Sequence, residues 1–158
     1  MAHLVLGLSL DSTGPYISHT TYYTKEARSN GSSNGIADDR NAFRVVLDSG
    51  ASRHTWFNSS AVKEQKTVAP IDLITASGKA LRVNKLGSVN ITESICIKSV
   101  AVVPSAAVNL MSVSKVTAAG YNVDFTATHA RILTQTGSVL LTFKRAPNGL
   151  YVFDMSRP

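Results

Sequence analysis

Cysteine is nearly absent from this sequence of 158 residues, and the scarcity excludes some kinds of site. The single cysteine, Cys96, cannot form a disulfide within the chain. Together with four scattered histidines, it gives no spacing typical of a metal site. Cys96 lies between Ile95 and Ile97, a setting that favours a small buried hydrophobic residue. We therefore expect no metal and no cofactor.

Long apolar runs and clusters of like charge are also absent. No run approaches the about 18 apolar residues that a membrane-spanning helix needs. The net charge is +6 with a sequence pI of about 9.7, and the charged residues are scattered. This basic balance permits weak association with RNA, but a solvated surface is the simpler interpretation, and no aromatic–basic pattern of an RNA-binding motif accompanies it.

The composition does support one folded domain preceded by a flexible segment. Hydrophobic residues make up 44% of the chain, enough for a core. Residues 1–10 are apolar but lack a basic leader, which favours a strand or the remnant of an upstream region over a signal peptide. Residues 29–35 contain only serine, asparagine and glycine, typical of a linker. We predict a disordered N-terminal segment at 1–41 and a domain at 42–155.

The stretch that begins this domain carries the most informative pattern. Val45, Val46 and Leu47 predict a buried strand, and Asp48 follows them directly. Gly50 allows a sharp turn after the acid, so a carboxylate would sit at the edge of a core, where its pKa can be tuned. Asp-Ser-Gly is also an ordinary turn sequence, as the near-copy at 11–14 shows. His54 is either a catalytic base or a satisfied polar group.

The rest of the domain predicts strands joined by short turns, and therefore a mainly β fold. Alternating apolar residues with turn formers between them predict three hairpins and a final strand, at 71–83, 87–97, 130–143 and 150–153. One helical stretch is predicted at 107–116, with Asn109 as its N-cap and Gly120 as its C-terminal stop.

Three motifs together resemble a known family. Asp48-Ser49-Gly50-Ala51 resembles the Asp-Ser/Thr-Gly-Ala/Ser signature of aspartic proteases, and residues 46–54 resemble the start of the protease region in Pol polyproteins of copia-type (Pseudoviridae) retrotransposons. Residues 109–114 are similar to the Asn-Leu-Leu-Ser-Val-Ser motif of the same proteins, and residues 120–125 follow as they do there. The resemblance covers about residues 43–153.

The resemblance implies a small closed retropepsin-like β-barrel with one short helix, acting as an aspartic endopeptidase on polyprotein peptides. Peptide hydrolysis by carboxylates needs two acids that share a proton. One chain supplies a single acid of this kind, so the partner is expected to be a second copy, with Asp48 contributed by each chain of a homodimer. Ser49 would hydrogen-bond across the two loops, while Gly50 and Ala51 would leave room for substrate. The implied location is a cytoplasmic virus-like particle.

Two further features bear on this interpretation. The turn at Ala76, Ser77 and Gly78 resembles a turn at this place in copia-type proteins. By analogy with retroviral proteases, the hairpin of this chain is expected to be either a flap that closes over the peptide or a plain surface hairpin. Retroviral proteases carry a glycine after two apolar residues where this chain has Ser112. The alternative function is therefore a non-catalytic β-barrel, kept as a structural or dimerisation module of a degenerate or domesticated polyprotein.

Overall fold

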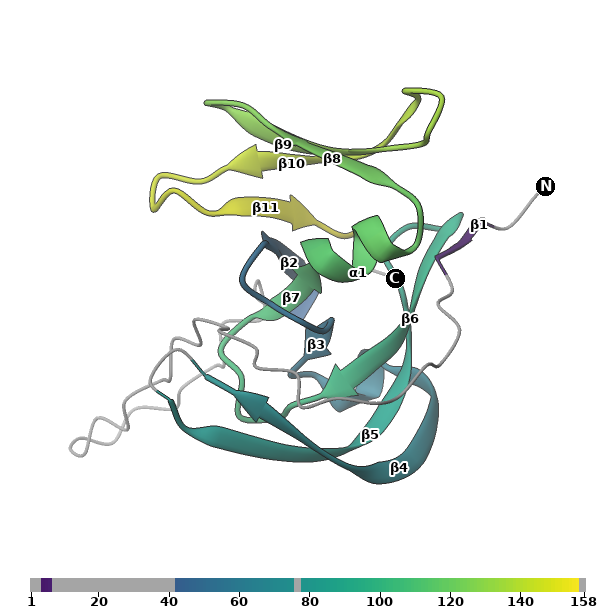
Figure 1. Cartoon of the computed structure of the whole chain (residues 1–158), viewed down its shortest axis with the longest axis vertical. Coiled ribbons are helices and arrows are strands. Elements are labelled where there is room, and N and C mark those ends of the chain that lie inside the picture. Colours follow the sequence, from purple (N-terminus) through teal and green to yellow (C-terminus); the bar gives the residue numbers. More distant parts are fainter. Residues whose placement is uncertain (1–3, 7–41, 76–77, 157–158) are drawn as a thin grey trace.

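The computed structural model describes residues 4–6, 42–75 and 78–156 of the chain, and they form a strand-rich molecule (Figure 1). In chain order the elements are β1 (Leu4–Leu6), β2 (Arg44–Asp48), β3 (Thr55–Trp56), the short 3-10 helix η2 (Ser59–Ala61), β4 (Lys63–Ile74), β5 (Ala80–Asn90), β6 (Ile95–Val102), β7 (Asn109–Ser112), α1 (Val113–Ala118), β8 (Asn122–Phe125), β9 (His129–Leu133), β10 (Val139–Arg145) and β11 (Tyr151–Asp154). The predicted mainly β class with one short α-helix is confirmed for the described residues.

The strands form an open sheet, so the prediction of a closed barrel is wrong. The pairing order is β4-β5-β6-β3-β7-β2-β11-β10-β9-β8, with β1 paired to β6 beside this path. Figure 1 shows β4 and β5 at one end of the molecule and β8 to β10 at the other. Within the described residues β4 and β8 do not pair, as closure would require. The mostly exposed, charged strand β4 suits an open edge, because charge discourages further pairing.

Strand β2 lies in the middle of this order. It runs parallel to β7 and antiparallel to β11, and its three central residues are buried. The largest core cluster joins β2 to residues far away in the chain, including Trp56, Ile132 and Phe143, each with no exposed side-chain surface. A strand held on both edges and packed against this core gives its terminal residue a fixed position.

The predicted hairpins are confirmed by the strand pairing. Antiparallel ladders join β4 to β5, β5 to β6, β9 to β10, and β10 to β11. β4 begins at Lys63, earlier than the predicted start at residue 71. The sequence pattern did not indicate the first half of this strand, because that half is mostly polar and exposed. In the last turn Gly149 has a φ of 85°, a conformation that glycine adopts without strain.

The predicted helix at 107–116 is only partly correct. Residues 109–112 form the buried strand β7, and α1 begins at Val113 with Ser112 as its N-cap. The prediction of Asn109 as N-cap is wrong, because its buried side chain bonds the backbone of neighbouring segments instead. Pairing with β2 overrode the helical pattern, since it satisfies the backbone of a fully buried segment. Gly120, at a φ of 87°, follows the helix end as predicted.

Near the N-terminus, β1 pairs in parallel with β6, with Leu4 opposite Ile95. The predicted linker and the rest of residues 1–41 lie outside the described residues, so the domain boundary at residue 42 stays a prediction. Within the part of the chain that the structure describes, no helix has the length and apolar character required to cross a membrane.

Candidate active site

Asp48 stands at the carboxyl end of β2, where the predicted strand places it. Val45, Val46 and Leu47 are at most 4% exposed, so the strand that carries the acid is anchored in the core. Asp48 itself is half-buried, and the next two residues, Ser49 and Gly50, are exposed. The acid is therefore both rigidly held and open to solvent on one side.

The surroundings of the Asp48 carboxyl group act on its pKa in two directions. Burial raises the pKa above its ordinary value, while hydrogen bonds from the backbone N–H groups of Gly50 and Ala51 partly oppose this rise. The Gly50 N–H donates to Asp48 Oδ1 at 2.7 Å. A carboxyl group that keeps its proton to a higher pH than usual suits a shared-proton pair, in which one acid must be protonated.

The loop that follows Asp48 contacts the junction of β7 and α1, chiefly through Ser112 and also through Ser114, whose Oγ lies 3.3 Å from the Ala51 carbonyl. Ser112, with no exposed surface, lies opposite Asp48 in the β2–β7 register. Its hydroxyl donates to the Ala51 carbonyl at 2.5 Å, and Ser114 Oγ lies 2.9 Å from Ser112 Oγ. Ala51 is buried and packs with Val46 and Leu110. The serine that departs from the retroviral pattern is thus a central contact of this loop.

His54 ends the same loop and occupies a buried position. Its ring is part of a residue that is 6% exposed, and its Nδ1 accepts the backbone N–H of Ser112 at 3.1 Å. Burial, reinforced by the positive charge of Lys115, lowers the His54 pKa to about 4. A neutral imidazole with Nδ1 occupied as an acceptor carries its proton on Nε2. These contacts favour the satisfied polar group over the catalytic base.

A groove of about 510 Å³ borders Asp48. Most of its lining is apolar, and it is formed by β2 and the start of the loop after it, by β7 and the segment before it, by β8, and by β11 and the turn before it. The lining residues are Val46, Leu47, Asp48, Ser49, Val108, Leu110, Phe125, Gly149, Leu150 and Tyr151. Phe125 and Tyr151 form an edge-to-face pair with ring centroids 5.2 Å apart. The Tyr151 hydroxyl donates to the Thr126 carbonyl at 2.6 Å, which fixes the ring in place.

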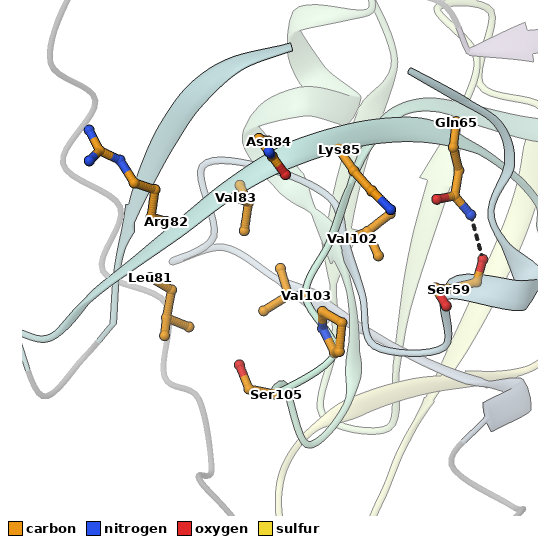
Figure 2. A pocket seen from close by; sticks show the side chains of 11 residues that line it. Ser59, Gln65, Leu81, Arg82, Val83, Asn84, Lys85, Val102, Val103 and Ser105 are labelled. Atoms are coloured by element: carbon orange, nitrogen blue, oxygen red, sulfur yellow. Dashed lines mark hydrogen bonds between the residues drawn. The ribbon is translucent and has the colours of Figure 1, made fainter. Parts of the chain in front are cut away.

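A second, smaller pocket of about 380 Å³ shares no lining residue with this groove. Figure 2 shows its apolar side chains, among them Leu81, Val83 and Val103, with Arg82 and Lys85 on β5 near them. Gln65 Nε2 donates to the Ser59 carbonyl at 2.7 Å on one side of the pocket. None of the described residues that line this pocket is acidic.

The predicted flap residues are only partly visible. Ala76 and Ser77 lie outside the described residues, whereas Gly78 closes the β4–β5 turn by donating its N–H to the Thr75 carbonyl at 2.8 Å. The hairpin itself is present, and its role as a flap stays a prediction. Among residues 42–75 and 78–156, no group of three or more acidic, histidine or cysteine side chains could hold a metal ion.

Sequence reasoning missed the roles of several residues that support β2 or line the groove. Asn109 has no exposed surface; its Nδ2 donates to the Arg44 carbonyl at 3.0 Å, and its Oδ1 accepts the Phe57 N–H at 3.1 Å. Phe125 and Tyr151 reach the groove from strands distant in the sequence. An amide in an otherwise apolar segment was the available signal for Asn109, and it was interpreted as a helix cap.

The fold and site define a mainly β domain with an Asp-Ser-Gly-Ala loop at the end of a central strand. Residues 45–121 match the family described as "Pol polyprotein, beta-barrel domain". This match supports a Pol polyprotein region, and it runs from β2 to the residue before β8. No curated protein and no solved structure matches the chain significantly.

Proposed function

We propose that this chain is an aspartic endopeptidase of a copia-type Pol polyprotein, active as a homodimer in which each copy contributes Asp48. The observation that carries the proposal is the setting of Asp48: a half-buried acid at the end of a core strand, followed by exposed Ser49 and Gly50 and bordered by a groove. The exposed side of the loop leaves a route for a second copy to approach.

The two carboxyl groups would divide the work of hydrolysis. Two acids about 3 Å apart cannot both ionise, so the pair shares one proton. The ionised Asp48 takes a proton from the attacking water, and the protonated Asp48 of the second copy polarises the peptide carbonyl. Ser49 of each loop would hydrogen-bond to the other loop and hold the two acids in register. The apolar groove would bind an apolar side chain of the peptide beside the bond that is cleaved.

The decisive experiment compares Asp48→Asn with Asp72→Asn in a cleavage assay on a proteome-derived peptide library, with mass spectrometry as the readout. Asp72 is an exposed acid on β4 that pairs loosely with Arg82 at 3.4 Å, so its replacement makes the same chemical change away from the loop. We expect Asp48→Asn to lower cleavage by at least about 10³-fold and to keep the fold, and Asp72→Asn to cleave like the wild type. Wild-type activity in Asp48→Asn would refute the mechanism.

The second candidate is a non-catalytic structural or dimerisation module of a decayed polyprotein. The sequence Asp-Ser-Gly occurs only once in the chain, at residues 48–50. A chain that stays monomeric therefore has no acid pair, which favours this second candidate. Sedimentation velocity with and without a statine-type peptide separates the two functions. The protease is expected to form a dimer that binds this mimic of the transition state. A dimer that does not bind the peptide would support the second candidate.

A further inference from the structure

Ser112 stands between the acid loop and helix α1, and its position suggests a role beyond packing. We propose that Ser112 is a positioning residue: its hydroxyl fixes the Ala51 carbonyl, so that the N–H groups of Gly50 and Ala51 stay directed at the Asp48 carboxylate. The consequence for catalysis rests on the proposed protease function. The effect on the Asp48 carboxyl group holds for the folded chain whether or not it is an enzyme.

The donor and acceptor capacity of Ser112 fits this role. A serine hydroxyl donates one hydrogen bond and accepts up to two. Ser112 Oγ gives its proton to the Ala51 carbonyl at 2.5 Å, which leaves its lone pairs for the Lys115 N–H at 3.3 Å and for Ser114 Oγ at 2.9 Å. The contact to Ala51 is the shortest of the three. The hydroxyl therefore binds the loop more closely than it caps the helix.

The backbone of Ser112 holds the far end of the same loop. Its N–H donates to His54 Nδ1, so a single residue contacts both Ala51 and His54. Ladder pairing of β2 with β7 fixes the near end, where Asp48 lies opposite Ser112. All of these contacts to Ser112 are shielded from solvent, because the residue has no exposed surface. A buried hydrogen bond of this kind meets little competition from water and restricts the loop strongly.

The effect of Ser112 on Asp48 can be measured because the charged groups near Asp48 stay the same when Ser112 is replaced. Besides Asp48, the titratable side chains on β2, on the loop after it, on β11 and on α1 are Arg44, Arg53, His54, Lys115, Tyr151 and Asp154, and β7 carries none. Replacing Ser112 by alanine changes none of these groups and removes one neutral hydroxyl. A change in the titration of Asp48 would therefore report on the backbone N–H groups that bind it, since these hydrogen bonds lower its pKa.

The test is a pH titration of the Asp48 carboxyl carbon by NMR in the full chain, for the wild type, Ser112→Ala and Thr117→Ala. Thr117 is the matched control: an exposed hydroxyl on the same helix that bonds only the Val113 and Ser114 carbonyls among the described contacts. For Ser112→Ala we expect the Asp48 pKa to rise by roughly 0.5–1 unit, about the value of one neutral hydrogen bond. Thr117→Ala is expected to titrate like the wild type.

A folded Ser112→Ala chain in which Asp48 titrates as in the wild type would overturn the proposal. If that variant does not fold, Ser112→Cys gives the answer, because a thiol keeps a side chain of similar size but donates only a weak hydrogen bond to the Ala51 carbonyl. Here a smaller rise is expected, and no rise would also overturn the proposal. If Asp48→Asn proves as active as the wild type, the protease function fails while the NMR result still decides the role of Ser112.

Discussion

The part of the chain that matches the Pol family and the part that follows it contribute to the site in different ways. Residues 45–121 supply the acid, its loop and the Ser112 contacts. Residues 122–154 supply β11, which pairs with β2 on the opposite edge from β7, and the aromatic wall of the groove. The first part thus holds the acid and its loop, and the second part shapes the space beside them.

The comparison also shows that the two parts share one core. Val45 and Trp56 from the matched part pack in the same cluster as Ile132 and Phe143 from the part that follows. Arg44, the β2 residue directly before the match, donates from its guanidinium to Asp154 Oδ1 at 2.7 Å across the β2–β11 ladder. The residues outside the family match are therefore expected to be needed for the fold that positions Asp48, and the following predictions test this.

The largest effect is expected from Phe143→Ala, a substitution in the second part. Phe143 has no exposed surface, so its removal leaves a cavity and should lower the free energy of unfolding by about 3–5 kcal/mol. Denaturant unfolding followed by the fluorescence of Trp56, the single tryptophan of the chain, reads the effect in the first part. Val139→Ala, at a residue 50% exposed, is the control and should change stability by less than about 0.5 kcal/mol. If the unfolding midpoint measured by Trp56 fluorescence were unchanged in Phe143→Ala, the two parts would not share one core.

A somewhat smaller effect is expected from His54 in the first part, and it depends on pH. Because the folded-state pKa is about 4 and the ordinary value is 6.5, only the unfolded chain takes up a proton between these values. Stability should therefore be complete above about pH 6.5 and fall by roughly 3 kcal/mol as the pH approaches 4. In His54→Asn, whose amide oxygen can accept the Ser112 N–H, this dependence should flatten. Urea unfolding at several pH values checks it, and an unchanged slope in the variant would exclude His54 as its source.

The local features of this chain could be predicted from the sequence because short-range patterns determine them. The strand before Asp48 follows from three consecutive apolar residues, and the hairpins follow from alternation and turn formers such as Asn148-Gly149. The acid at the strand end was thus placed correctly. The position of Gly120 after the helix follows from the same kind of local rule.

The features that failed depend on contacts between distant residues. Residues 109–112 have a pattern compatible with a helix, and only pairing with β2, more than sixty residues earlier, makes them a strand. The sheet is open because its end strands, β4 and β8, do not pair with each other, and no local sequence pattern encodes this. The contacts of Ser112 with Ala51 and His54 and the arrival of Phe125 at the groove likewise need the folded chain.

The smallest of these effects concerns the groove and applies to the proposed protease. Phe125 is 46% exposed, so Phe125→Ala should cost little stability beyond the edge-to-face contact with Tyr151, about 0.5–1.5 kcal/mol. It should nevertheless lower kcat/KM by about tenfold for peptides with a bulky apolar side chain next to the cleaved bond, because the groove loses one wall. Peptides with alanine at that position should lose less.

Val139→Ala is the matched control for this substitution, since Val139 is a comparably exposed apolar residue that does not line the groove. Competition assays with paired peptides would measure both variants against the wild type. An equal loss for bulky and small side chains, or an equal loss in Val139→Ala, would show that the second part acts on cleavage only through stability. A loss confined to Phe125→Ala and to bulky side chains would instead assign peptide selection to residues outside the family match and leave the acid chemistry to Asp48.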